Sequence, residues 1–292
     1  MLFSIIIPTY NRAVILRNTL FSVLSQTFPD YEIIVVDDGS TDNTAGVVNE
    51  LNESRIRYFY KTNEERSVAR NFGADRAEGQ YLIFLDSDDE MKPDHLATIS
   101  DFIGRQAGPP EFIFAGYVIL NPDKTPLYEY GISGFFNPAN LFYGNYLGCS
   151  SVIVKQSLFK QFYFNTDRAL ILFEDWELWL RIIADNKLYC FPGKSIVMVN
   201  HGARSVLNYS PTQISDKIQH FKNHILRSSQ SIKSSLFYRS SFLSGIYSYA
   251  ALHIAMTKKS RAAAVKYLVL ALFCNPLFIF KRRFLGIIKQ LF

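Results

Sequence analysis

The sequence has no acidic residue after Asp216, although its 292 residues contain 26 Asp and Glu. Residues 217–292 carry 13 Lys and Arg, interleaved with long apolar stretches. A basic and apolar segment of this kind favours an anionic lipid surface over a nucleic acid as its partner. We therefore expect this end of the chain to associate peripherally with the inner face of the cell membrane, and we expect no nucleic-acid partner.

Three further absences narrow the class of protein. The cysteines, Cys149, Cys190 and Cys274, are widely spaced and form no C-x-x-C pair. This argues against a disulfide framework or a zinc site and favours a reducing, cytoplasmic compartment. The N-terminus has no basic region before its apolar run, so we expect no signal peptide. Neither G-x-G-x-x-G nor G-x-x-x-x-G-K-S/T occurs, which disfavours a dinucleotide-binding Rossmann site and a P-loop.

No apolar run is long enough to cross a membrane. The most apolar segment, residues 262–280, is interrupted by Lys266, Asn275 and Pro276. It therefore falls short of the roughly 20 apolar residues that a spanning helix requires. We expect this segment to lie on the membrane surface.

The last residues, 277–292, can form an amphipathic helix. Its apolar side would consist of Leu277, Phe280, Phe284, Ile287, Ile288 and Leu291. Arg282, Arg283 and Lys289 would lie on the flanks or back, and Lys281 would fall inside the apolar arc and would have to snorkel. The alternative is an ordinary amphipathic helix that packs on the protein and turns a basic face to solvent.

Apolar strand-like runs alternate with helical patterns over the first part of the chain. This alternation predicts right-handed β-α-β crossovers, and hence an α/β fold with a mainly parallel sheet covered by helices on both faces. Strands are expected at residues 3–8, 31–36, 56–60, 81–85, 111–120, 151–155 and 188–199, and helices at residues 13–26, 43–52, 67–77, 93–105 and 176–186. Residues 121–148, rich in Gly, Pro and Asn, are predicted to be a loop. The pattern is helical from about residue 210, which divides the chain into a domain over residues 1–209 and a helical extension over residues 210–292.

The strand at residues 81–85 runs directly into three carboxylates, Asp86, Asp88 and Asp89. Acids packed this closely repel one another, so they need solvent or a shared cation. Ligands bind at the carboxyl ends of strands in open α/β sheets, and Mg²⁺ or Mn²⁺ held there by one or two carboxylates would be completed by water and a diphosphate. The pattern predicts a nucleoside-diphosphate site. The alternative is a solvated acidic turn that caps the helix beginning near Pro93.

Several runs of residues, in order along the chain, resemble the family 2 glycosyltransferases, which have the GT-A fold. The matching runs are residues 5–12 (IIIPTYNR), 25–27 (SQT), 32–42 (EIIVVDDGSTD), 69–71 (ARN) and 79–89 (GQYLIFLDSDD). The resemblance extends over about residues 1–205. It implies a GT-A sheet flanked by helices, a nucleoside-diphosphate sugar as donor and Mn²⁺ or Mg²⁺ as cofactor.

By this resemblance, the donor site lies at the ends of the first strands. Thr9 and Asp38 would contact the nucleoside, Asp38 through the base, whereas Asp86 would lie near the ribose. Asp88 would bind the metal that bridges the donor diphosphate, and Arg70 would lie near the nucleotide. For the segment around Asp38 alone, a strand-to-helix turn with an N-cap is the alternative.

The resemblance also bears on three residues outside the strand ends, Glu65, Gly148 and His201. Glu65 replaces a glycine that the family commonly has in the loop before the Ala-Arg-Asn run, which leaves the shape of that loop open. Gly148 lies where the family has a glycine-bearing loop beside the donor sugar, with a tight turn as the alternative. His201 resembles the family's C-terminal histidine, which can approach the metal or the diphosphate, with a structural role as the alternative.

The run at residues 173–179 (FEDWELW) resembles the family's Glu-Asp motif at the start of a helix, with Asp175 as the catalytic base. An acceptor hydroxyl is a poor nucleophile and must lose its proton as it attacks the anomeric carbon. A single base opposite a departing diphosphate gives displacement with inversion, and a metal stabilises the leaving charge. The alternative is that Glu174 and Asp175 only stabilise the positive end of a helix. Trp176 and Trp179 are expected to pack in the core.

We therefore expect an inverting, metal-dependent glycosyltransferase that moves a sugar, most simply from a UDP-sugar, to a hydroxyl of a glycan or lipid-linked glycan in surface polysaccharide synthesis. A sugar nucleotidyltransferase is one alternative, but it would need a glycine-rich, basic loop after the first strand, and Pro8 to Asn11 provide none. A non-catalytic, membrane-associated protein that binds nucleotide sugars is the other. The retained carboxylates at Asp38, Asp86, Asp88 and Asp175 count against it.

Overall fold

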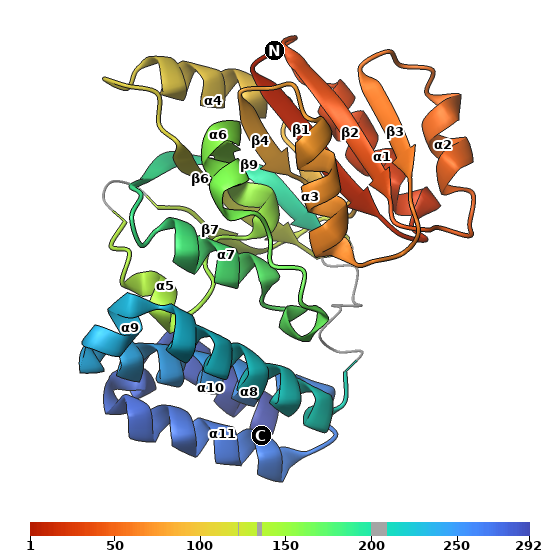
Figure 1. Ribbon diagram of the computed structural model, residues 1–292. Coiled ribbons are helices and arrows are strands. Elements are labelled where there is room, and N and C mark those ends of the chain that lie inside the picture. Colours follow the sequence, from red (N-terminus) through yellow and green to blue (C-terminus); the bar gives the residue numbers. More distant parts are fainter. Residues whose placement is uncertain (122, 133–135, 200–208) are drawn as a thin grey trace. The chain divides into compact units, whose positions relative to one another are not determined.

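The computed structural model describes residues 1–121, 123–132, 136–199 and 209–292 (Figure 1). The chain forms two compact units. The first consists of Met1–Phe136, Leu147–Thr166 and Asp185–His201, and the second of Asn137–Tyr146, Asp167–Ala184 and Gly202–Phe292. The second unit therefore includes two segments from the middle of the chain. The division of the sequence at residue 209 stays a prediction.

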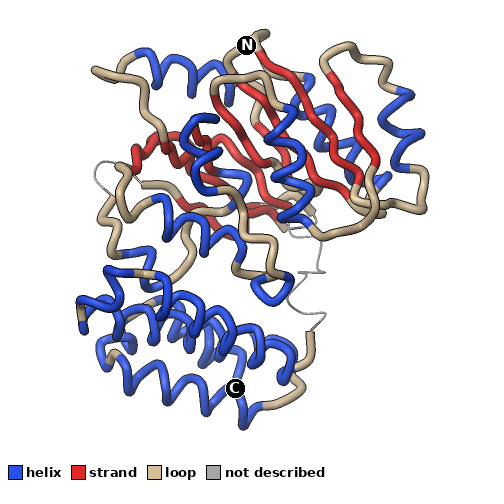
Figure 2. Tube along the Cα trace, viewed as in Figure 1, coloured by secondary structure: helices blue, strands red, loops and turns tan. Residues whose placement is uncertain are grey.

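The first unit is built from a sheet and its covering helices (Figure 2). Its strands are β1 (Phe3–Thr9), β2 (Tyr31–Asp37), β3 (Ile56–Tyr60), β4 (Tyr81–Phe84), β5 (Asp89–Met91), β6 (Phe112–Leu120), β7 (Pro126–Tyr130), β8 (Val152–Lys155) and β9 (Leu188–Val199). Its helices are α1 (Ala13–Leu24), α2 (Thr44–Glu50), α3 (Arg66–Arg76), α4 (His95–Gly104), α6 (Gln156–Phe162) and the short 3₁₀ helix η1 (Cys149–Ser151).

The described strands form one nine-stranded sheet in the order β3-β2-β1-β4-β8-β6-β9-β5, with β7 paired to β6. The strands β3, β2, β1 and β4 run parallel, and so do β6 and β9. The pairs β4–β8, β6–β8, β5–β9 and β6–β7 are antiparallel. The predicted α/β fold is confirmed, and the sheet is parallel where helical crossovers connect its strands and mixed beyond β4.

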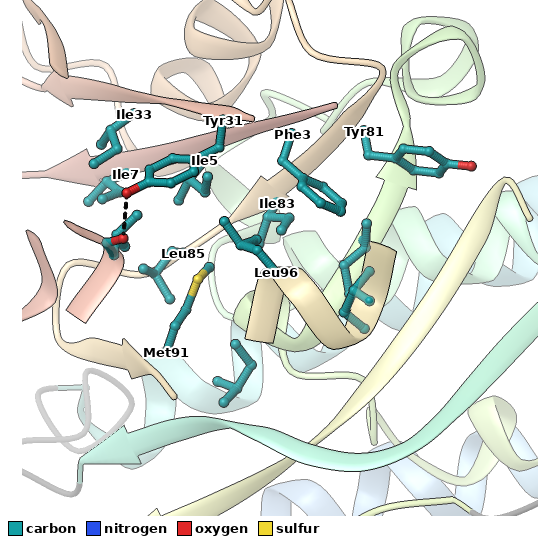
Figure 3. Close-up of a cluster of buried hydrophobic side chains, with 14 of the residues drawn as sticks. Phe3, Ile5, Ile7, Tyr31, Ile33, Tyr81, Ile83, Leu85, Met91 and Leu96 are labelled. Atoms are coloured by element: carbon teal, nitrogen blue, oxygen red, sulfur yellow. Dashed lines mark hydrogen bonds between the residues drawn. The ribbon is translucent and has the colours of Figure 1, made fainter. Parts of the chain in front are cut away.

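Alternate residues of the central strands face opposite layers of helices, as the two-residue period of a strand requires. On one face, Ile5, Ile33 and Ile83 are fully buried in a cluster that includes Leu16 of α1 and Leu96 of α4 (Figure 3). Fully burying such a side chain stabilises a fold by about 1.5 to 3 kcal/mol. This packing fixes the strands, and therefore the positions of the residues at their carboxyl ends.

Helices α3 and α6 pack on the opposite face of the same strands. A Cβ atom on Gly73 of α3 would lie 2.5 Å from Cγ2 of Ile6, so only glycine permits this close approach of helix and strand. The ring centroid of Phe159 in α6 lies 4.9 Å from that of Phe84. The sheet is therefore covered on both faces.

The second unit consists of helices. They are α5 (Asn140–Tyr143), η2 (Arg168–Leu170), α7 (Glu174–Ile182), α8 (Pro211–Ser228), α9 (Gln230–Ser234), α10 (Leu236–Thr257), α11 (Arg261–Cys274), η4 (Pro276–Phe280) and α12 (Arg282–Leu291). α10 is central, because α5, α8, α9, α11 and α12 all pack against it. Across the described ranges, no helix is both long and apolar enough to span a membrane.

The single amphipathic helix predicted for residues 277–292 is two helices. Lys281 separates them because its backbone is extended, with φ −88° and ψ 141°. Ile287 and Leu291 of α12 are buried, and α12 packs against α10. Lys281 does not snorkel along this face; its Nζ lies 5.3 Å from the ring centroid of Tyr143. For α12, the alternative of a helix packed on the protein describes the structure better than a free membrane anchor.

His95, at the start of α4, is fully buried. Its Nδ1 lies 2.6 Å from Oγ of Ser195 in β9, and its Nε2 has no hydrogen-bond partner within the described ranges. Burial disfavours the imidazolium and lowers the pKa of His95 from 6.5 to about 4, although the charge of Asp94 acts in the opposite direction. His95 is therefore neutral in the folded protein at neutral pH.

We expect His95 to make the fold sensitive to mild acid. Below about pH 6.5 the unfolded chain binds a proton at this imidazole, whereas the folded chain does not until about pH 4, so stability is full above this window and falls as the pH drops through it. At pH 5 the effect is about 2 kcal/mol. Unfolding midpoints at pH 7.5 and pH 5 should differ less in His95→Gln than in the wild type. Ser195→Ala, which keeps the imidazole buried, should retain the wild-type difference; an equal difference in all three proteins would contradict the assignment.

Candidate functional site

The parallel strands of the first unit bring their carboxyl ends to one edge. The backbone N–H of Asp38 donates to the carbonyl oxygen of Thr9 at 2.9 Å, and that of Lys61 donates to Asp37 at 2.9 Å. The N–H of Leu85 donates to Ile6 at 3.0 Å, which fixes the residues that follow β4 beside the end of β1. This edge therefore carries Thr9, Asp38 and the acids after β4, as predicted from parallel pairing.

Thr9 and Asp38 are both nearly buried at this edge. Oγ1 of Thr9 is buried and has no hydrogen-bond partner in the part of the chain that the structure describes. A buried hydroxyl without a partner is costly, so Thr9 is suited to bind a ligand. The Asp38 carboxylate accepts from Nζ of Lys61 at 2.7 Å and from the backbone N–H groups of Glu64 and Glu65 at 3.1 and 2.8 Å. These three donors hold the Asp38 carboxylate in one orientation.

Glu65 has the backbone conformation of a glycine. Its φ of 81° and ψ of 162° lie in a region that is essentially restricted to glycine. The conformation aims the N–H of Glu65 at Asp38 and starts α3, the helix that carries Arg70. The loop therefore takes a glycine conformation even though the glycine common in the family is replaced.

The three acids after β4 are each compensated differently. Oδ1 of Asp86 accepts from Nη2 of Arg70 at 2.6 Å, and Oδ2 of Asp88 forms an ion pair with Nη1 of Arg12. Oδ2 of Asp89 accepts from Oγ of Ser150 at 2.5 Å. These acids do not cap the following helix, because α4 begins at His95 and no side chain caps it.

The carboxyls of Asp86 and Asp89 have opposite pKa shifts. Burial by itself raises the pKa of Asp86, but the charges of Arg70 and other arginines, with the hydrogen bond from Arg70, hold it below its ordinary value. Burial, followed by repulsion from Asp86 and Asp88, raises the pKa of Asp89 well above its ordinary range. The cluster thus combines a charged carboxylate at Asp86 with a carboxyl at Asp89 that favours its neutral form.

The segment that begins at Gly148 reaches this cluster through Ser150. Oγ of Ser150 accepts from the backbone N–H of Asp86 at 3.1 Å and donates to Asp89. A Cβ atom on Gly148 would lie 2.5 Å from Cε of Met198, so the end of the Met198 side chain packs directly against this glycine. The hydroxyl and backbone of Ser151 both donate to the Gly148 carbonyl, which closes a tight turn.

Asp175 belongs to the second unit, at the start of α7. Its Oδ2 accepts from Nδ2 of Asn145 at 2.8 Å, and its Oδ1 accepts from the backbone N–H of Trp176 at 2.7 Å. The preceding Leu172 has φ 89°, and its N–H donates to Oε2 of the buried Glu174 at 2.8 Å. Leu172 is thus another non-glycine residue in the left-handed region beside a proposed site residue.

The two tryptophans of α7 pack in the core, as predicted. Trp176 and Trp179 are buried, and Nε1 of Trp176 donates to the carbonyl oxygen of Leu141 at 2.7 Å. An indole N–H that is satisfied by the backbone, on a ring that solvent does not reach, is not available to stack on a sugar.

The first unit therefore brings together most of the predicted site residues. They are Thr9, Asp38, Arg70, Asp86, Asp88 and Gly148, whereas Asp175 belongs to the second unit. His201 lies outside the described residues. Sequence reasoning missed Arg12, Lys61 and Ser150; the first follows Asn11 directly in the first matching run, which is the signal that could have drawn attention to it. Within the described ranges, no group of three or more His, Cys, Asp or Glu residues could hold a metal ion.

Two solved structures with a similar fold contain a bound nucleotide or nucleotide sugar. S. aureus TarS 1-349 in complex with UDP is 19% identical, with a TM-score of 0.59, and the match covers 92% of this chain and 89% of that one. The mannosyltransferase PcManGT from Pyrobaculum calidifontis, in complex with GDP-Man and Mn²⁺, is 18% identical with a TM-score of 0.59, covering 99% and 83%. Together with the sheet and its covering helices, these likenesses define the GT-A fold.

The sequence comparisons give the family. Residues 4–130 match the model of the family described as glycosyl transferase family 2. The chain is 36% identical over 161 residues to the Bacillus subtilis protein named as a teichuronic acid biosynthesis glycosyltransferase, TuaG, which covers 52% of this chain. It spans 62% of the length of that relative.

A second relative is matched over more of its length. The Escherichia coli UDP-Glc:alpha-D-GlcNAc-diphosphoundecaprenol beta-1,3-glucosyltransferase WfgD is 33% identical over 196 residues, which cover 64% of this chain and 72% of WfgD. The chain belongs to glycosyltransferase family 2.

We expect Glu65→Gly to stabilise the protein. A non-glycine residue in this region costs about 1 to 3 kcal/mol, and the greater freedom of glycine in the unfolded chain offsets about 0.4 to 1 kcal/mol of the relief. The N–H that binds Asp38 is retained. The free energy of unfolding, measured in urea, should rise by about 1 kcal/mol. Glu65→Ala keeps a Cβ atom and should give no comparable gain; if alanine stabilised as much as glycine, the conformation would not be the cause.

Proposed function

We propose that this chain is an inverting, metal-dependent hexosyltransferase that moves a sugar from a nucleoside-diphosphate sugar to a hydroxyl of a glycan or lipid-linked glycan in bacterial surface polysaccharide synthesis. The observation that carries the proposal is the strand-end cluster. There the Thr9 hydroxyl, which has no partner among the described residues, and the fixed Asp38 carboxylate share one edge with Asp86 and Asp88. Such an edge provides the donors and acceptors that a nucleotide requires.

UDP is the nucleotide that the comparisons favour. The relative WfgD is named for UDP-Glc as donor, and structures of TarS hold UDP or UDP-GlcNAc. In this chain, Asp38 would accept from the base, Asp86 would lie near the ribose, and Arg70 would keep Asp86 charged. The acceptor of WfgD is a lipid-linked diphospho-sugar, which favours an acceptor of the same class here.

The donor set fits a hard divalent cation. Asp88 supplies carboxylate oxygens from a half-buried side chain that already faces a positive group, Arg12. One or two protein carboxylates are sufficient, since water and a diphosphate complete the sphere of Mg²⁺ or Mn²⁺. Asp88 would hold the ion, together with His201 by the family resemblance. When bound, such an ion stabilises negative charge on a leaving diphosphate.

Asp175 would act as the base. Asn145 donates to Oδ2 and the Trp176 N–H donates to Oδ1, so the carboxylate is held in one orientation. It would accept the proton of the acceptor hydroxyl while that oxygen attacks the anomeric carbon from the side opposite the diphosphate. One displacement of this kind inverts the configuration of the anomeric carbon.

A single set of measurements tests this assignment. One nucleoside diphosphate among UDP, GDP, CDP and dTDP should raise the melting temperature by several degrees when Mn²⁺ is present, because a ligand that binds only the folded state stabilises it. Asp175→Asn should show the same shift. Its transfer from UDP-glucose to a synthetic GlcNAc-diphosphate lipid should fall by about 100-fold or more.

The matched control is Asp167→Asn, a carboxylate of the same unit that is about half exposed and does not belong to the proposed site. It should keep both transfer and the thermal shift. Equal loss of nucleotide binding and transfer in Asp175→Asn would show that Asp175 is not the base. No shift of the wild type with any of the four nucleotides would contradict the donor site itself.

The second unit would bind an anionic membrane surface through α11 and η4. Val265, Val269 and Phe273 follow one another at intervals of four residues on the exposed side of α11, and Leu277 and Phe280 of η4 are also exposed. No acid occurs in residues 217–292, so the basic residues of this segment are not offset by acids within it. Such a surface combines apolar insertion with attraction to anionic lipid. Leu277 and Phe280 belong to the apolar side predicted for residues 277–292, whereas Ile287 and Leu291 of that side are buried.

We expect the double substitution Val269→Glu and Phe273→Glu to reduce co-sedimentation with phosphatidylglycerol vesicles by about tenfold or more, since two apolar side chains are lost and two negative charges are added. Val14→Glu, at a site in the first unit that is 84% exposed, is the matched control and should bind like the wild type. Point changes are preferable to deletion of α12, which would remove Ile287 and Leu291 from the core. Unchanged sedimentation of the double variant would rule out this face.

A further inference from the structure

Arg12 occupies the carboxylate that the proposed function assigns to the metal. Its Nη1 forms an ion pair with Oδ2 of Asp88, and the two side chains are 37% and 31% exposed. Within the described residues, Asp88 is the one side chain with which the Arg12 guanidinium pairs. Its charge also favours the ionised forms of Asp86 and Asp89, although it has the smallest of the effects on each pKa, and burial keeps the pKa of Asp89 well above its ordinary value. Arg12 thus pairs directly with Asp88 and contributes more weakly to the balance of charge at Asp86 and Asp89.

The backbone on either side of Arg12 is fixed. Before it, the N–H of Asn11 donates to Oγ of Ser40 at 2.8 Å, and Oδ1 of Asn11 accepts from the N–H of Thr41 at 2.8 Å. After it, the N–H of Ala13 donates to Oδ2 of Asp42 at 3.0 Å. The backbone at Arg12 is therefore anchored to the loop that follows β2. Breaking the ion pair between Arg12 and Asp88 would then require only rotation of the Arg12 side chain.

Arg70, a second arginine that acts on the cluster, lacks this freedom. It is only 2% exposed, its guanidinium lies 5.1 Å from the ring centroid of Phe164, and it is bonded to Asp86 at 2.6 Å. The side chains of Arg12 and Arg70 thus differ in how freely they can move. Arg70 is a permanent part of the site, whereas Arg12 sits on the partly solvated side of the cluster with a long side chain that can leave.

We propose that Arg12 holds Asp88 until a divalent cation replaces it, and that the released guanidinium then binds the diphosphate of the donor. This inference rests on the proposed function, because it takes Asp88 as the metal ligand. A guanidinium and a divalent cation repel each other and compete for the same carboxylate oxygens, so they cannot both be held by Asp88 at close range. Arginine is also well suited to a diphosphate, since it offers two parallel N–H donors to phosphate oxygens.

The two roles of Arg12 have effects of opposite sign. Removing the guanidinium should strengthen metal binding, because the competitor is lost, and weaken diphosphate binding, because a donor is lost. A residue that only supported the fold of the β1–α1 turn would change both affinities in the same direction. A gain in metal affinity together with a loss in diphosphate affinity would therefore distinguish the exchange from a structural role of Arg12.

The test is a Mn²⁺ titration without nucleotide, followed by electron paramagnetic resonance, for the wild type, Arg12→Gln and Arg12→Lys. We expect Arg12→Gln to bind Mn²⁺ about three to ten times more tightly, as loss of a partly exposed ion pair and of like-charge repulsion implies. Arg12→Lys keeps the charge and should stay near the wild type. Arg17→Gln is the matched control, because it removes an equal charge from the next turn of α1, where Arg17 pairs with Glu50 at 3.4 Å outside the site.

Calorimetry at saturating Mn²⁺ gives the second readout, with whichever of UDP, GDP, CDP and dTDP stabilises the wild type. Its affinity should fall about fivefold or more in Arg12→Gln and remain near the wild type in Arg17→Gln. Unchanged or weaker Mn²⁺ binding by Arg12→Gln, while the wild type binds Mn²⁺, would overturn the exchange but leave the proposed function standing. A wild type that binds neither Mn²⁺ nor any of the nucleotides would instead overturn the proposed function, and the exchange with it.

Discussion

Repulsion among the three carboxylates that follow β4 is the constraint on which the first unit depends. Each acid is compensated by a different part of the chain: Asp86 by Arg70 of α3, Asp88 by Arg12 at the start of α1, and Asp89 by Ser150 of η1. These partners are far from one another in sequence, so the cluster ties two crossover helices and the segment before β8 to one strand end. The order of strands places β8 directly beside β4, where η1 can deliver Ser150.

Charge and backbone conformation act together on the nucleoside side of the same edge. Asp38 is held by Lys61 and by two successive N–H groups, and the second of these points at Asp38 because Glu65 takes a glycine conformation. The strain at Glu65 is local, whereas the hydrogen bond that it permits orients a carboxylate proposed to contact the base. Leu172 shows the same pattern before Asp175 in the second unit. Glu65 and Leu172 thus place backbone strain beside proposed site residues, which is where strain with a functional role is commonly found.

The sequence predicted the fold well where a residue pattern has a single structural meaning. Alternating apolar runs gave β1 to β4 and their crossovers, and parallel pairing then implied that Thr9, Asp38 and Asp86 share an edge. The sequence did not predict strands that are short or that form only through tertiary contacts. The three residues of β5 include two acids, and β7 lies in a segment whose Gly, Pro and Asn content suggested a loop. The residues that compensate the three acids could not be predicted from the sequence either. Neither the ion pair of Arg12 with Asp88 nor the hydrogen bond from Ser150 to Asp89 follows from spacing along the chain.

The C-terminal helices show why amphipathicity alone does not identify a membrane anchor. An apolar helix face that packs against the protein cannot also bind a membrane. In α12 this face packs against α10. Beside this contact, Arg283 donates to the carbonyl oxygens of Tyr143 and Gly245. α11 also packs against α10, yet its exposed side retains Val265, Val269 and Phe273. Any affinity of this unit for lipid must come from apolar surface that folding leaves exposed. The basic composition of residues 217–292, which contain no acid, would set the sign of the surface that they bind, and the helix packing decides which side chains could reach it.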